Sequence, residues 1–175
     1  MLERGYVQLY TGNGKGKTTA ALGLAMRAAG AGLKSIILQF MKGQQYGELD
    51  AATRFDGLIT IEQYGSDRFC TPDSGNREEH YRRSREGIAR SRAVLCNEAI
   101  PIVILDEIVT ACLYKLVTLD EILDLIKIKP PDRELILTGR GAPPELIEAC
   151  DLVTEMKEIK HYYMRGIEAR RGIEY

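Results

Sequence analysis

The residues best suited to chemistry form the stretch TGNGKGKTT at positions 11–19. This stretch follows the apolar residues 6–10 and precedes the alanine-rich residues 17–31, as a turn between a strand and a helix would. Glycines let backbone N–H groups turn towards a phosphate, and a helix N-terminus adds positive potential. The pattern therefore predicts a binding loop for a di- or triphosphate, made of Gly12, Asn13, Gly14, Lys15, Gly16, Lys17, Thr18 and Thr19.

The spacing of this loop departs from the usual phosphate-binding pattern. The pattern G-x-x-x-x-G-K-[ST] places its first glycine where this chain has Thr11, and Gly12 comes one residue late. Lys17 would still place an ammonium on the phosphates, and Thr18 would offer a hydroxyl to Mg²⁺. Phosphate binding is predicted, while ordinary phosphate transfer becomes the weaker hypothesis.

Acidic and basic side chains follow two later apolar segments. Asp106 and Glu107 end the segment ILDE, where an acid commonly completes the Mg²⁺ site of a P-loop protein. The alternative is that both acids merely favour a helix N-terminus. Arg140, in the turn TGRG, would bind phosphate as a planar fork or would be an ordinary surface arginine. An N-K-x-D segment for guanine is absent, so adenine is the predicted base.

Strand-like and helix-like segments alternate along the chain. Solidly apolar strands are typical of a parallel sheet covered on both faces. The sequence therefore predicts an α/β fold with a mostly parallel central sheet, helices on both faces, and the candidate residues together at the carboxyl ends of the strands. The arginine-rich helix predicted at 77–99 has interleaved acids, which indicates a solvated basic face. The predicted strands are 6–10, 35–40, 58–64, 102–105, 134–138 and 152–156, and the other predicted helices are 17–31, a helix opened by the capping box at 118–121, and 143–149.

Length and composition favour one domain spanning residues 1–175, and the loop at 11–19 makes it a predicted P-loop domain. The 24 basic and 25 acidic residues nearly cancel, which argues against a nucleic-acid partner. No apolar run reaches the roughly 18 residues of a membrane span, and the charged start shows no signal peptide. The four scattered cysteines indicate reduced thiols, so a cytoplasmic location is predicted.

Taken together, these segments resemble the ATP:corrinoid adenosyltransferases of the cob(I)alamin or cob(I)yrinic acid a,c-diamide type. The resemblance rests on TGNGKGKTTAALG, QFMKG (39–43), GNRE (75–78), LDE, LTGRG and the ending KHYYMRGIEARRGIEY, and it runs from about residue 5 to residue 175. The shifted glycine is itself part of that family's pattern.

The resemblance implies a RecA-like P-loop fold and a transfer that leaves the phosphate chain intact. Co(I) of a reduced corrinoid would attack C5′ of ATP and release triphosphate, in adenosylcobalamin biosynthesis or salvage. It implies Mg²⁺ (or Mn²⁺) held by Thr18 and Glu107, with Asp106 as a further candidate ligand. Lys17, Glu107 and Arg140 are the implied catalytic residues, and Phe69 is a candidate contact to the corrin ring.

The resemblance also implies a homodimer and a flavoprotein reductase that supplies Co(I). Two other functions remain open from the residues alone. One is a P-loop ATPase or kinase with Glu107 as the base, and the other is a non-catalytic ATP-binding switch.

Overall fold

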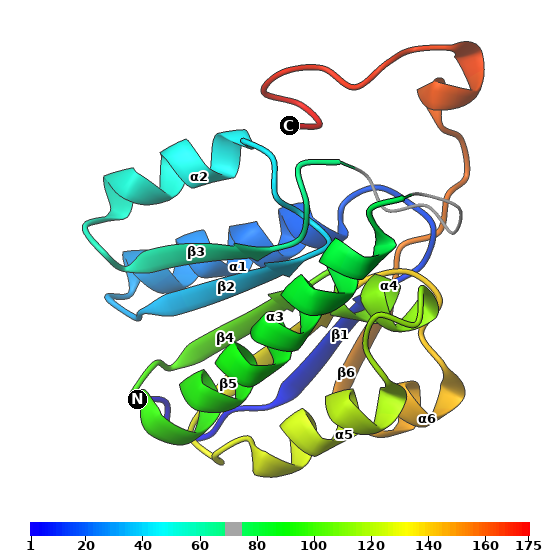
Figure 1. Cartoon of the computed structure of the whole chain (residues 1–175). Helices are drawn as coiled ribbons and strands as arrows, with labels where there is room; N and C mark the ends of the chain where they lie inside the picture. Colours follow the sequence, from blue (N-terminus) through cyan, green and yellow to red (C-terminus); the bar gives the residue numbers. More distant parts are fainter. Residues whose placement is uncertain (69–74) are drawn as a thin grey trace.

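A sheet of six parallel strands forms the centre of the computed structural model, which describes residues 1–68 and 75–175 (Figure 1). The strands lie in the order β3-β2-β4-β5-β1-β6. Every pairing is parallel, with Leu9 opposite Leu137 and Ile37 opposite Ile104. The strands are β1 (Val7–Thr11), β2 (Ser35–Phe40), β3 (Ile59–Tyr64), β4 (Ile102–Asp106), β5 (Glu134–Thr138) and β6 (Leu152–Glu155).

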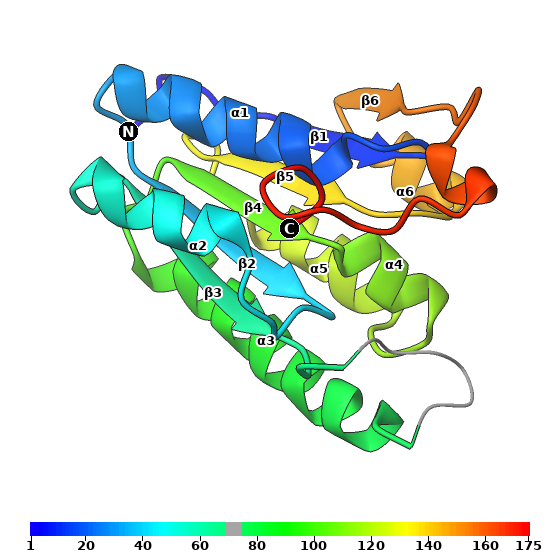
Figure 2. The same cartoon turned by 90° about the horizontal axis from the view of Figure 1, so that it is seen from above.

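Helices cover both faces of the sheet, as Figure 2 shows. The prediction of a mostly parallel sheet between two helical layers is thus confirmed. On one face lie α1 and α2 with η1, and on the other lie α3, α4, α5 and α6. The helices are α1 (Lys17–Gly30), α2 (Gly47–Ala52), η1 (Thr53–Phe55), α3 (Arg77–Asn97), α4 (Ile108–Leu113), α5 (Leu119–Ile128), α6 (Pro144–Glu148) and η2 (Tyr162–Arg165).

Alternation of side chains along the strands produces two apolar layers. Ile36 and Leu38 of β2 pack towards α3 and α4, whereas Ile37 packs towards α1. Helix α1 places Ala21 and Ala25 against the sheet. These small side chains, spaced one helical turn apart, let the helix lie close to the strands. This close packing fixes the position of the loop that precedes α1.

The predicted capping box of α5 is present. Thr118 accepts a hydrogen bond from the backbone N–H of Glu121, whose side chain accepts one from the N–H of Thr118. The short helices α2 and α4 were not predicted, since each has only six residues and is too short to show a helical period.

The solvated basic face predicted for α3 is wrong in part. Arg90 binds Glu62 of β3 and also pairs with Glu98, while Arg85 pairs with Glu121 of α5. The pairs with Glu62 and Glu121 tie α3 to β3 and α5, whereas Glu98 is the residue that caps α3 itself. None of the described helices is long and apolar enough to cross a membrane.

The residues after β6 return across the molecule. They run from the edge strand through η2 and end beside the N-terminus of α2, where the backbone of Tyr175 lies near Gly47 (Figure 2). Tyr163 and Met164 of this segment are among its most exposed apolar side chains. The segment therefore begins beside the loop that follows β1 and ends beside α2, the helix that follows β2.

Candidate functional site

The glycine loop joins β1 to α1 and packs against the residues that follow β6. The N–H of Gly14 donates to the carbonyl oxygen of Met156 at 2.7 Å. A Cβ on Gly12 or Gly14 would lie only 2.5 or 2.7 Å from that oxygen. Gly12 and Gly16 also have φ values of 96° and 123°, which side-chain-bearing residues rarely adopt. Several glycines of the loop are therefore required by its packing, and the N–H of Gly14 points to Met156.

Lys17 is the first residue of α1, and its side chain folds back onto the backbone of the loop. Its Nζ donates to the carbonyl oxygens of Gly12 at 2.7 Å and Gly14 at 2.8 Å. The side chain is buried, and this burial lowers the pKa of Lys17, while the carboxylate of Glu107 opposes the shift. The first helical bond runs from Ala20 N to the oxygen of Gly16, so the amides of residues 17–19 precede it. These amides add to the positive potential at the helix start.

Asp106 is the centre of the site and is fully buried at the end of β4. Its Oδ1 accepts hydrogen bonds from the hydroxyls of Thr18 at 2.9 Å and Thr138 at 2.7 Å. Its Oδ2 accepts from Lys42 Nζ at 2.9 Å and from Gln39 Nε2 at 3.3 Å. Strand β5 lies between β1 and β4, so Thr138 at its end bridges the gap between the loop side and the acid.

Burial and pairing have opposing effects on the charge of Asp106. Complete burial alone would raise the pKa of this carboxyl, yet the charge and hydrogen bond of Lys42 hold it below its usual range. The hydrogen bonds from Thr138 and Thr18 act in the same direction. For Lys42, burial would lower the pKa, and the Asp106 carboxylate raises it instead. The two groups therefore form an ion pair.

Glu107 follows Asp106, and its backbone and side chain form hydrogen bonds with Thr138 and Thr110. It has a left-handed backbone, with φ 61°, and its N–H donates to Thr138 Oγ1 at 2.9 Å. Its carboxylate accepts a hydrogen bond from the Thr110 hydroxyl, which in turn accepts one from the N–H of Arg140 at 2.9 Å. Glu107 is thereby linked to the turn that carries Arg140.

Arg140 lies in a tightly packed turn after β5. A Cβ on Gly139 would lie 2.4 Å from the backbone nitrogen of Thr110, so this turn fits against α4 only with glycine. The Arg140 side chain is exposed, and its charge still acts on Lys17, as do those of Asp106 and Glu107. The structure thus brings the predicted loop, acids and arginine to one edge of the sheet.

Three polar residues at this edge were not predicted as site residues. Lys42, Gln39 and Thr138 all contact Asp106. Each lies in a quoted segment, QFMKG or LTGRG, at or near the end of a strand: Thr138 ends β5, Gln39 is the last but one residue of β2, and Lys42 comes two residues after β2. This position near a strand end was the feature of the sequence that could have identified them as site residues.

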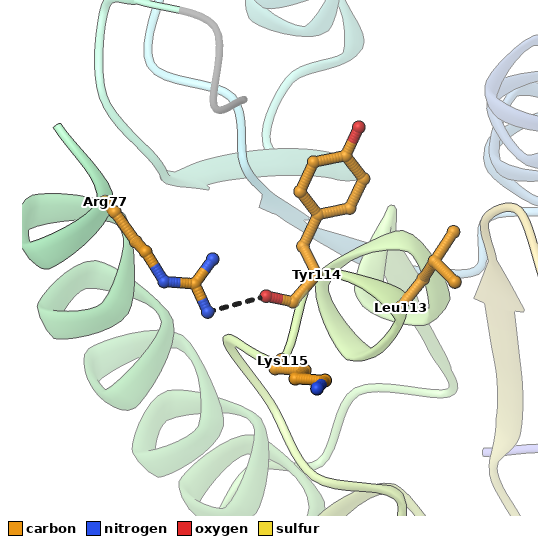
Figure 3. A pocket seen from close by; sticks show the side chains of 4 residues that line it. All are labelled: Arg77, Leu113, Tyr114 and Lys115. Carbon is orange, nitrogen blue, oxygen red and sulfur yellow. Dashed lines mark hydrogen bonds between the residues drawn. The ribbon is translucent and has the colours of Figure 1, made fainter. Parts of the chain in front are cut away.

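Among the predicted residues, Phe69 lies outside the described residues. The described part of the chain holds no group of three or more His, Cys, Asp or Glu side chains that would bind a metal by themselves. A cavity of about 330 Å³ lies beside α4, lined by Arg77, Leu113, Tyr114 and Lys115 (Figure 3). Arg77 closes one wall, since its Nη2 donates to the Tyr114 carbonyl at 3.0 Å. Leu113 is 54% exposed and contacts the Arg140 turn at Gly141.

P-loop proteins hold nucleotide phosphates in a loop of this kind, between a strand and the helix that begins with lysine and threonine. The site and the strand order together define the chain as a P-loop protein of RecA-like fold. A KaiC-like protein from the hyperthermophilic archaeon Pyrococcus horikoshii OT3 is similar in fold, with a TM-score of 0.53 over 88% of this chain and 74% of that one, at 16% identity.

Sequence similarity defines the class more narrowly. Residues 3–175 match the family described as ATP:corrinoid adenosyltransferase BtuR/CobO/CobP. The corrinoid adenosyltransferase of Escherichia coli (strain K12) is 34% identical over 99% of this chain and 87% of the relative. That of Pseudomonas aeruginosa is 34% identical over 99% and 85%, and the corrinoid adenosyltransferase CobA of Salmonella typhimurium 32% over 99% and 87%. The chain belongs to the ATP:corrinoid adenosyltransferase family.

Proposed function

We propose that this protein transfers the 5′-deoxyadenosyl group of ATP to the Co(I) centre of a corrinoid and releases triphosphate. The observation that carries the proposal is the distribution of charge at the site. Lys17, Arg140 and the first-turn amides of α1 supply positive potential at one edge. Both acids are held by internal hydrogen bonds, Asp106 most extensively. Such a site binds and stabilises an anion and leaves the nucleophile to the substrate.

The proposed reaction uses the protein to bind the anion and the corrinoid to supply the nucleophile. The electron pair of Co(I) forms the cobalt–carbon bond at C5′, and the C5′–O bond breaks with its electrons going to the triphosphate oxygen. Because the corrinoid brings its own nucleophile, the protein has to orient ATP and stabilise the departing charge. Lys17 and Arg140 would do so at the phosphates, once the triphosphate draws Lys17 Nζ from the carbonyls of Gly12 and Gly14. The alternative, a P-loop ATPase or kinase with Glu107 as the base, is not favoured by the family to which the chain belongs.

The oxygen donors at the edge suit Mg²⁺ or Mn²⁺. The hydroxyl of Thr18 and the carboxylate of Asp106 lie 2.9 Å apart, and Glu107 follows directly. Mg²⁺ prefers oxygen ligands and is commonly held by one or two carboxylates together with substrate phosphates. Thr18 and Glu107, with Asp106 as a further ligand or a partner of the ligand shell, would hold the ion. A bound ion would neutralise charge on the triphosphate.

The family resemblance implies a corrinoid substrate, an aromatic contact to it, a homodimer and a reductase, whereas the cavity is a feature of the structure. A reduced corrinoid has to reach C5′, and we propose that the cavity beside Leu113, next to the Arg140 turn, lies on its path. Phe69 remains the candidate aromatic contact to the corrin ring. A cytoplasmic location, a single P-loop domain, a homodimer and a flavoprotein reductase as the source of Co(I) complete the proposal.

The reaction is tested with ATP, Mg²⁺ and cobalamin kept at Co(I) by a chemical reductant. We expect intact triphosphate in phosphorus NMR spectra, formed in step with the spectrum of an alkylated corrinoid. A control without corrinoid should release neither triphosphate nor ADP. Release of ADP and phosphate at a comparable rate without corrinoid would contradict the transferase and favour an ATPase.

A further inference from the structure

Lys42 is a cation in the site that has no role in the proposed adenosyl transfer. Its Nζ lies 2.9 Å from Oδ2 of Asp106, on the carboxylate oxygen opposite to the one that Thr18 and Thr138 contact. Its side chain is only 15% exposed, whereas that of Asp106 is fully buried. The ammonium therefore neutralises the central acid of the site from the β2 side.

The backbone holds Lys42 firmly in this place. Met41, directly before it, has a left-handed φ of 60°, which turns the chain back at the end of β2. A Cβ on Gly65 would lie 2.3 Å from the carbonyl carbon of Met41, and one on Gly43 would lie 2.6 Å from that of Ser66. These contacts fasten the segment after β2 to the segment after β3. The position of the Lys42 backbone is thus built into the fold, and only its flexible side chain is free to move.

The Lys42 ammonium has a second set of partners close by. Oε1 of Glu48 lies 3.7 Å from it, and the ring of Tyr46 lies under it with 5.2 Å to the centroid. Both residues belong to the start of α2, and Gln39 Nε2 links Glu48 to Asp106 by donating to the two carboxylates at 3.1 and 3.3 Å. Leaving Asp106 would therefore not leave the charge without a partner, because a second carboxylate and an aromatic face already lie beside the ammonium.

The proposed substrate creates a conflict around Asp106. Thr18, the proposed ligand of the metal ion, donates its hydroxyl to the same carboxylate that Lys42 neutralises. A divalent cation beside Thr18 and the Lys42 ammonium would repel each other across Asp106. A triphosphate arriving with the metal offers Lys42 a strong new partner, since an ammonium binds phosphate as a compact positive charge.

We propose that Lys42 is an exchangeable counter-ion of Asp106, which the metal–triphosphate pair displaces and which then binds the triphosphate. Lys42 weakens metal binding while the anion is absent and strengthens anion binding when it is present. This inference rests on the proposed function for two choices, triphosphate as the anion and a divalent cation beside Thr18.

Two titrations without any corrinoid test the exchange, each on the parent chain and on Lys42→Met. Mn²⁺ alone, followed by electron paramagnetic resonance, should bind the variant about tenfold more tightly, because a repelling charge is gone. Inorganic tripolyphosphate with Mg²⁺, followed by calorimetry, should bind it about ten- to a hundredfold more weakly, because a charge-assisted contact is lost. Lys127→Met, on the exposed side of α5, is the matched control and should change neither value.

The opposite signs separate this role from a structural one. A variant that only damages the fold would lose both affinities, and that result, or two unchanged affinities, would overturn the proposal. If Lys42→Met does not fold, the comparison is made on the Asp106→Asn background, where the acid is neutral. Adding Lys42→Met there should still weaken tripolyphosphate binding about tenfold, and no further loss would refute the exchange. Because no corrinoid takes part, failure of adenosyl transfer would leave these results unaffected.

Discussion

Thr138→Val is the substitution that most cleanly probes how the site is held together. The Thr138 hydroxyl donates to Asp106 Oδ1 at 2.7 Å and accepts from Glu107 N at 2.9 Å, at a position with no solvent exposure. Valine has nearly the same shape, so the change removes both hydrogen bonds and leaves no cavity. A hydrogen bond to a charged group contributes about 1.5–3 kcal/mol, and an amide left without its acceptor costs about 1–3 kcal/mol.

The two effects share one hydroxyl and do not add fully, so we expect a loss of about 2–3 kcal/mol in the free energy of unfolding. Urea denaturation followed by circular dichroism measures it, with a midpoint lower by about 1 M for an m-value of about 2–3 kcal/mol/M. Thr60→Val, at an exposed position of the edge strand β3, is the control and should stay within about 0.5 kcal/mol of the parent. If the two variants were equally stable, Thr138 would not connect the strands as described.

Three further changes test other parts of the site. Lys17→Ala should lower the transfer rate about 10²–10³-fold, since it removes a positioned charge at the phosphates; a steady-state rate within threefold of the parent would exclude Lys17 from the mechanism. Gly14→Ala should weaken ATP binding in calorimetry, because its Cβ would lie 2.7 Å from Met156 O, whereas Gly23→Ala, with open space around it, should not. The lowered pKa of Asp106 means that its charged form stabilises the parent above the ordinary carboxyl pKa of 3.8, and that this stabilisation is lost as the pH falls through the lower folded-state pKa. Asp106→Asn should remove this contribution to the free energy of unfolding. The parent and Asp106→Asn should therefore converge in acid, and a stability gap independent of pH would argue against the ion pair.

Much of the architecture could be predicted from local pattern. The strand at residues 35–40 is apolar at four of its six positions and is buried at every position, as a central parallel strand requires. Thr118 and Glu121 predicted a helix start because both capping partners lie within one turn of each other. The meeting of the candidate residues at one edge followed from the rule that parallel strands share a carboxyl edge.

The partners of Asp106 could not be found in this way. Lys42 and Thr138 meet this acid only because β2 and β5 both neighbour β4, and strand order is a property of the whole sheet. The role of Gly14 was likewise hidden, since its close neighbour Met156 follows the last strand of the chain. Arg90 was expected in solvent for the same reason, because its acid Glu62 lies on β3. In each case the missing information was a contact between distant segments.

The central claim is that the protein breaks the C5′–O bond of ATP and leaves every P–O bond intact. It is tested most directly with ATP that carries a heavy oxygen isotope at the 5′ oxygen, incubated with Mg²⁺ and Co(I) cobalamin. Adenosyl transfer predicts that mass spectrometry finds the whole label in triphosphate, with none in a nucleoside product, while the deoxyadenosyl group stays on cobalt. Label retained in ADP, AMP or adenosine would show cleavage at phosphorus and would contradict the proposed reaction.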